Sequence, residues 1–275
     1  MSSVVRYTFL AILALGLTAC ASKPDEVLPE ERYYENARSA MRSGNFNEAE
    51  RNLNALETYY PFGRYAEQAQ LDLIYARYQN LDLEGARSAA DRFLRLNPQS
   101  EHADYAIYLR GIAAYNLDIS LAQRYFGVDA TARDLGMQRQ AFRDFNELLT
   151  RYPNSEYAAD ARQRMIAIRN RMAALELHAA RYYIKREAYI AANNRARFVV
   201  ENYPSAPVAE EALRLMAETF LILDLQDAAQ DAIQLLATNF PDSEAFDRNQ
   251  KFQAKLIKPQ RRSLLSVVTF GLFGD

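Results

Sequence analysis

The sequence has 275 residues, with 33 Lys and Arg against 35 Asp and Glu and a formal net charge of −2. This balance gives no reason to expect a nucleic-acid partner. Nine glycines and nine prolines are few, since average usage gives roughly 19 and 14 at this length. Because 49% of the residues are hydrophobic, we predict an ordered helical chain.

The chain begins with MSSVVRYTFLAILALGLTAC, in which one arginine precedes an uncharged run that extends to Ala19. This run of about 13 residues is too short to span a bilayer as a helix, which takes ~20, and is typical of a secretory signal. The LTAC at 17–20 resembles the lipobox of bacterial lipoproteins. We predict that residues 1–19 are removed and that Cys20 carries diacylglycerol and N-linked palmitate.

The predicted anchor decides the compartment. Cys20 is the only cysteine, so no internal disulfide is possible. Several acyl chains hold a protein stably in a membrane, whereas a single acyl chain does not. Ser22 is not the aspartate that retains lipoproteins at the inner membrane, so we predict the periplasmic face of the outer membrane. An ordinary signal with an accidental cysteine is the alternative.

Residues 20–31 lack apolar periodicity and hold two prolines, which predicts a flexible spacer.

Five segments share one pattern, in which a proline and a small turn residue follow an amphipathic stretch. The prolines stand at 61, 98, 153, 204 and 241, and the small residues 12 positions earlier are Ala49, Ala86, Ala141, Ala192 and Ala229. Proline cannot continue a helix and favours the turn to the next one. In the first segment, GNFNEA at 44–49 predicts the turn between two paired helices.

This pattern resembles the tetratricopeptide repeat, in which two antiparallel helices pack through small residues and a proline ends the unit. We therefore predict an all-α fold, a solenoid of about five helix pairs in a right-handed superhelix, over residues 32–246. Such pairs cannot bury their apolar faces alone, so they stack on one another. An unrelated helical bundle is the alternative.

Two departures from the repeat length are predicted. Residues 116–136 form an insertion between the helices of the third repeat. No glycine or proline lies between Asn154 and Tyr203, so residues 156–186 form one unusually long helix or two nearly collinear ones.

Charge is uneven along the second half. Residues 151–200 hold ten basic and four acidic residues, whereas residues 201–247 hold ten acidic residues and one arginine. One explanation is that these charges lie on solvated helix faces. Another is that the basic residues neutralise the acidic residues of the neighbouring repeat. Because arginine pairs bidentately with carboxylates, Arg195 and Arg197 are candidate partner-binding residues.

Four residues are predicted to line the concave face, from their positions on the first helices of repeats one and two. They are Tyr34, Arg38, Tyr75 and Tyr78. Tyrosines offer rigid contact area and a hydroxyl at low entropic cost, which suits extended peptides. Packing between helices is the alternative role.

Residues 247–275 form a basic and then apolar extension, in which residues 264–274 carry no charge. Such a segment favours a membrane surface or a partner groove, or folds back to cap the repeats.

No catalytic site is predicted. The two histidines, His102 and His178, lie far apart, and the sequence holds no HExxH, GxSxG, GxGxxG or phosphate-loop pattern. We expect no enzyme activity, no metal and no cofactor other than the lipid on Cys20.

Four stretches resemble the BamD family, also called ComL-like, the tetratricopeptide lipoproteins of the β-barrel assembly machinery. They are YPFGRYAEQAQLDLIYARY at 60–78, DRFLRLNP at 91–98, FGVD at 126–129 and RYPNSEYAADA at 151–161. The resemblance covers residues 32–245 and does not extend to the C-terminal segment.

The resemblance implies a non-catalytic scaffold. Its C-terminal repeats bind the POTRA domains of BamA, and its N-terminal groove contacts unfolded outer-membrane proteins and other lipoproteins of the complex. The family's contact arginine falls on Arg195, nine positions before Pro204. Two alternatives remain: a pilotin-type lipoprotein that escorts a secretin or pilus component, and a periplasmic cell-wall adaptor.

Overall fold

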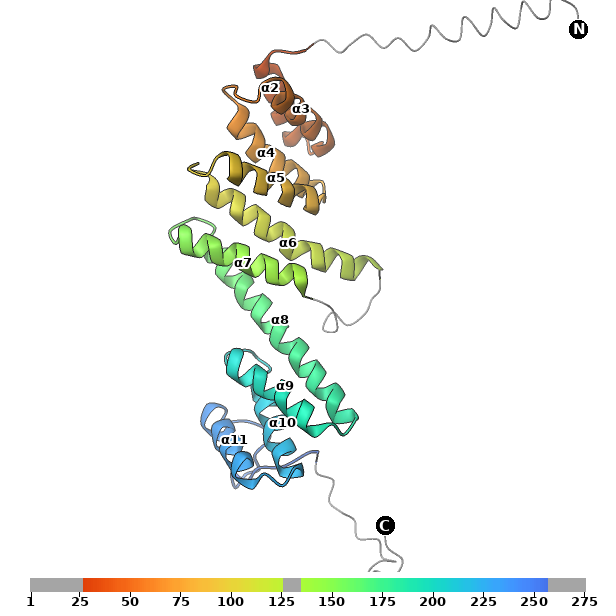
Figure 1. Cartoon of the computed structure of the whole chain (residues 1–275), viewed down its shortest axis with the longest axis vertical. Coiled ribbons are helices and arrows are strands. Elements are labelled where there is room, and N and C mark those ends of the chain that lie inside the picture. Colours follow the sequence, from red (N-terminus) through yellow and green to blue (C-terminus); the bar gives the residue numbers. More distant parts are fainter. Residues whose placement is uncertain (1–26, 126–134, 257–275) are drawn as a thin grey trace, which may run out of the picture. The chain divides into compact units, whose positions relative to one another are not determined.

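A computed structural model describes residues 27–125 and 135–256, with side chains described up to residue 117 in α6 (Figure 1). Cys20, most of the predicted spacer, the FGVD segment and residues 257–275 lie outside this part. The described residues form ten helices and no strand, which confirms the predicted all-α class. They divide into two compact units, one ending at Asn80 and one beginning at Leu81.

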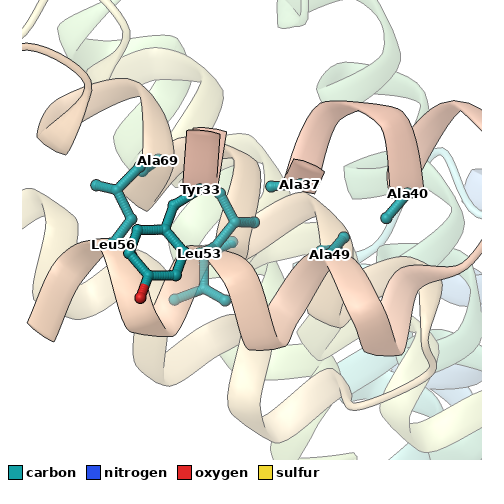
Figure 2. Packing of buried hydrophobic residues seen from close by; sticks show 9 residues of the cluster. Tyr33, Ala37, Ala40, Ala49, Leu53, Leu56 and Ala69 are labelled. Atoms are coloured by element: carbon teal, nitrogen blue, oxygen red, sulfur yellow. The ribbon is translucent and has the colours of Figure 1, made fainter. Parts of the chain in front are cut away.

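The first unit consists of α2 (Glu30–Arg42), α3 (Phe46–Tyr59) and α4 (Ala66–Gln79). All three helices contribute to one apolar core, at the three- and four-residue spacing of a helix face (Figure 2). The core residues labelled in that view are Tyr33, Ala37, Ala40, Ala49, Leu53, Leu56 and Ala69.

The turn between α2 and α3 follows the sequence prediction. Gly44 has φ +76°, a left-handed conformation that glycine adopts without steric cost. The side chain of Asn45 then caps α3 by accepting a hydrogen bond of 3.2 Å from the backbone N–H of Glu48.

The second unit contains seven helices. They are α5 (Leu83–Leu96), α6 (Ala103–Tyr125), α7 (Gly136–Arg151), α8 (Ala158–Lys185), α9 (Tyr189–Asn202), α10 (Ala209–Ile222) and α11 (Gln226–Asn239). Within each unit, the principal contacts join helices that are neighbours in the chain. This is the packing of successive helix pairs, and the handedness of the superhelix stays a prediction.

The five proline turns share one geometry. The helices α3, α5, α7, α9 and α11 each end two residues before their proline. In every case the residue before proline donates its backbone N–H to the carbonyl four residues earlier, at 2.8 Å, as Tyr60 does to Leu56. The proline pattern therefore located all five helix ends.

The repeated small residues lie in the cores, as predicted. The alanines 12 positions before the prolines are at most 1% exposed. At Gly111 the approach of α6 to α7 is closer still, since an added Cβ would lie 2.7 Å from Cε1 of Phe145. Small side chains at these positions let the helices of a pair approach each other closely.

Two helices are longer than a standard repeat. α6 continues to Tyr125, so residues 116–125 of the predicted insertion are helical. This stretch, NLDISLAQRY, holds no glycine or proline to end the helix. α8 is one continuous helix of 28 residues, which decides between the two sequence alternatives. In Figure 1 it runs from α7 to α9.

The described part of the C-terminal extension folds back onto α10 and α11. Phe246 and Phe252 form an isolated antiparallel bridge, and Phe252 packs against the α10–α11 core. The backbone N–H of Lys255 donates to Glu218 at 2.7 Å. Capping is thus the arrangement of residues 247–256. Among the described helices, none is both long and apolar enough to cross a membrane.

Candidate partner-binding surfaces

The first unit presents a pair of stacked tyrosines. The ring of Tyr34 on α2 lies 4.5 Å from that of Tyr65, with 15° between their planes. Tyr65 is the residue that precedes α4, and the turn around Pro61 brings it back beside α2. The guanidinium of Arg38 lies 5.9 Å from the centre of the Tyr34 ring, within the range of cation–π attraction.

A partly buried carboxylate lies behind this pair. Asp72 on α4 accepts hydrogen bonds from the Tyr34 hydroxyl and, at 2.9 Å, from the Gln68 amide. Burial raises the pKa of Asp72 above its usual range, and the hydrogen bonds and nearby Arg38 offset this only in part. The negative charge of Asp72 is therefore incompletely compensated in the free protein.

A hollow of about 620 Å³ opens beside the stacked rings. Its lining residues are Glu31, Tyr34, Glu35, Asn36, Arg38, Ser39, Arg42 and Tyr65. Arg38 and Arg42 stand one turn apart on α2, and among the described residues Arg42 has no ion-pair partner. Half-buried tyrosine rings and exposed guanidinium groups together suit an extended peptide that carries aromatic and carboxylate groups.

The structure separates the four residues that the sequence grouped. Tyr34 and Arg38 share the hollow, whereas half-buried Tyr75 packs edge-on against Phe46 at 6.1 Å. Tyr78, one turn further along α4, is also half-buried and does not line the hollow.

Sequence analysis missed three residues of this surface, namely Tyr65, Arg42 and Asp72. A signal for Tyr65 was present, because YPFGRY at 60–65 and YPNSEY at 152–157 both place a tyrosine four residues after the proline.

The second unit presents Arg195 on the surface formed by α8 and α9. Its Nη1 donates to Oε2 of Glu176 on α8 at 2.9 Å, and the side chain is 47% exposed. The hydrogen bond and the charge of Glu176 raise the pKa of Arg195. Arg195 thus pairs within its own helix pair, and it is Arg181 that reaches the acidic helix α10, through two bonds to Glu211.

Arg197 points away from Arg195, toward α10. Its Nη2 donates to Oδ1 of Asn193 at 3.4 Å, and its guanidinium lies 5.7 Å from the Phe220 ring. The Asn193 amide in turn donates to the Thr219 hydroxyl at 2.8 Å. The two arginines, two residues apart on one helix, therefore belong to different faces.

Within the described ranges, no group of three or more His, Cys, Asp or Glu is placed to hold a metal ion. The described helices define a helix-pair repeat protein.

The chain belongs to the YfiO family, described as outer membrane lipoproteins, which it matches over residues 27–246. A relative from Vibrio cholerae is 42% identical over 235 residues, covering 84% of this chain and 98% of its own length. A relative from Neisseria meningitidis serogroup B is 38% identical, covering 84% of this chain and 90% of its own length. A relative from Haemophilus influenzae is 32% identical, covering 87% of this chain and 92% of its own length.

All three relatives are named outer membrane protein assembly factor BamD. The predicted family resemblance is thereby confirmed. Among solved structures, a tetratricopeptide repeat protein from Parabacteroides merdae matches with a TM-score of 0.36 at 14% identity, covering 78% of this chain and 68% of its own. The assignment rests on the sequence relatives.

Proposed function

We propose that this chain is a non-catalytic lipoprotein scaffold of the β-barrel assembly machinery. It docks the POTRA domains of BamA through the α8–α9 surface and helps receive unfolded outer-membrane proteins at the hollow of the first unit. Family membership over residues 27–246 supports the assembly role. The observation that carries the docking proposal is the half-exposed, oriented guanidinium of Arg195.

Glu176 prepares Arg195 for docking. The bond to Glu176 at 2.9 Å and the contact with Tyr183 orient the side chain along the α8–α9 surface, and the guanidinium remains 47% exposed to a second carboxylate. A partner carboxylate then meets a guanidinium that is already ordered, which lowers the entropic cost of binding. Truncating one side of a buried charge pair costs about 2–5 kcal/mol, whereas a rim pair is worth well under about 1 kcal/mol.

The docking proposal is tested by the affinity of the purified POTRA domains for the full chain, at low and moderate salt. Arg195→Glu is expected to weaken binding by at least about thirtyfold, the lower end of that range. Arg143→Glu on α7 is the matched control, because Arg143 is also exposed and bonds only a neutral side chain, Gln140. A loss below threefold at both salt levels, with melting unchanged, would contradict the role of Arg195.

The scaffold role itself is tested by affinity isolation of the chain from solubilised membranes. Recovery of BamA and the other lipoproteins of the complex is expected. Recovery of a secretin would instead favour the pilotin alternative, and recovery of a murein synthase would favour the cell-wall adaptor.

The anchor is a further part of the proposal. Cys20→Ala is expected to abolish palmitate incorporation and release the chain from the outer membrane, because no other thiol is available for acylation. Cys20→Ala protein that still incorporates palmitate would refute the lipobox assignment.

A further inference from the structure

The middle of α8 borders a second, smaller hollow. It has a volume of about 130 Å³. Its lining residues are Ile166, Arg169, Asn170, Tyr203, Pro204, Ser205 and Ala206. The wall opposite α8 is the proline turn between α9 and α10.

This wall is held in place from several sides. The Tyr203 hydroxyl donates to the sulfur of Met172 at 3.7 Å, and Phe198 packs edge-on against the Tyr203 ring at 6.0 Å. Ala206 is buried in the core shared by α8, α9 and α10. Burial and the charge of Glu176 raise the pKa of Tyr203, so the hydroxyl is neutral at physiological pH. The hollow is therefore preformed and largely apolar.

The α8 side of the hollow combines an exposed apolar residue with arginines. Ile166 is 52% exposed. Arg162 and Arg169 stand four residues before it and three after it, which places all three on one helix face. Within residues 27–125 and 135–256, neither guanidinium has an ion-pair partner. By contrast, Arg164 on another face of α8 is paired with Asp160.

We propose that this hollow takes one aliphatic or aromatic side chain from an acidic segment of the partner that docks on Arg195. The inference rests on the proposed function and names the chemistry that its docking surface recognises. A cavity of roughly 150 Å³ accommodates a benzene ring, so the space fits one such side chain. Carboxylates on either side of it would meet Arg162 and Arg169.

The hollow is connected to the Arg195 surface through the contacts of Tyr203. Phe198 stands three residues after Arg195 on α9, is 42% exposed and contacts Tyr203. Glu176, which binds Arg195, also lies close enough to Tyr203 to affect its pKa. An anchor side chain in a well-packed pocket, surrounded by contacts that exclude water and by a polar rim, is the usual composition of an interface hot spot.

The test uses the full chain and the purified POTRA domains of BamA as the probe. Ile166→Asp removes the apolar rim, and Ser205→Trp fills the hollow from an exposed position that lines it. Each is expected to lower affinity by at least about tenfold. For Ser205→Trp, which adds no charge, the loss should be the same at low and moderate salt, because burial of apolar surface is not screened. Arg162→Glu and Arg169→Glu should each lower affinity a few-fold, with a smaller effect at moderate salt.

Leu235→Asp is the matched control, since Leu235 is a similarly exposed aliphatic residue on α11, at 43%; it should change affinity less than twofold. If Arg195→Glu abolishes binding while Ile166→Asp and Ser205→Trp both stay within twofold of wild type, the inference is overturned and the docking surface stands. If the wild-type chain does not bind the POTRA domains, the proposed function and this inference fall together.

Discussion

The two units use the same arrangement of side chains for different ends. In the first unit Tyr34 stacks on Tyr65 and its hydroxyl bonds Asp72. In the second unit Tyr108 on α6 stacks on Tyr157 at 4.6 Å and donates to Asp160 on α8 at 2.8 Å. In both units the second tyrosine directly precedes the helix that carries the carboxylate.

The difference lies in the charge around the carboxylate. Burial opposes ionisation of Asp160, but hydrogen bonds from Arg164 and Tyr108 outweigh it and lower its pKa. Burial and the bond to Asp160 raise the pKa of Tyr108 to about 12. Asp72 has a raised pKa instead.

The surroundings differ as well. The 620 Å³ hollow and the unpaired Arg42 lie beside the first pair of tyrosines, whereas the second pair has its own arginine. In the second unit, where Arg164 pairs with Asp160, the arrangement therefore stabilises the packing of α6 against α8. The arrangement in the first unit is the one at which we propose that a partner binds.

The largest expected effect is a loss of stability when the second tyrosine pair is disrupted. Tyr157 contacts both Tyr108 and Tyr105, so Tyr157→Ala should lower the free energy of unfolding by about 3 kcal/mol, near the lower end for removal of a packed aromatic ring. Urea unfolding of the full chain measures it. The same variant should leave client binding by the folded protein unchanged. A decrease in the free energy of unfolding of less than about 1 kcal/mol would show that the second tyrosine pair does not stabilise the packing of α6 against α8.

The next effect concerns client binding at the first pair. Arg42→Glu should weaken binding of an extended peptide with aromatic and acidic side chains by about tenfold, since reversal replaces attraction with repulsion at the hollow. Fluorescence anisotropy with a peptide from an unfolded outer-membrane protein measures it. Arg51→Glu on α3 is the control, because Arg51 is exposed in the same unit and does not line the hollow. Equal losses in the two variants would indicate a general charge effect.

The smallest effect is a pH dependence of opposite sign in the two units. The folded pKa of Asp160 is lowered, so its contribution is present above the unfolded value of about 3.9 and is lost as the pH falls through the folded pKa. Asp160→Asn should therefore destabilise the chain at pH 7 and have little effect in acid.

For Asp72 the sign is reversed. Its folded pKa is raised, so its contribution is present below the unfolded value and lost as the pH rises through the folded pKa. Asp72→Asn should match or exceed wild-type stability at pH 7, and the gain should vanish below about pH 4. Urea unfolding at both pH values compares the variants, and a shared sign for Asp72→Asn and Asp160→Asn would remove the distinction between the units.

The fold was largely predictable because its determinants are local. A proline and a small residue 12 positions earlier define a helix end and a close contact within about three helical turns, and all five pairs follow this spacing. The helical continuation of α6 to Tyr125 was missed because insertion length alone does not distinguish a loop from a longer helix.

The surfaces were less predictable because they depend on contacts between distant segments. The register of Tyr34 and Arg38 on α2 was readable, but Tyr65 joins them only through the turn around Pro61. For Arg195 the composition pointed to the acidic helices downstream. Its actual partner is Glu176, which lies in the second half of the long, unbroken helix α8.

That unbroken length has a mechanical consequence. At 1.5 Å per residue, the 28 residues of α8 form a rigid rod of about 42 Å that contacts both α7 and α9. The spacing of these two neighbours is fixed by the backbone hydrogen bonds of a single helix rather than by a deformable turn. A load applied where α9 packs is therefore carried along α8 to α7 without a hinge to absorb it.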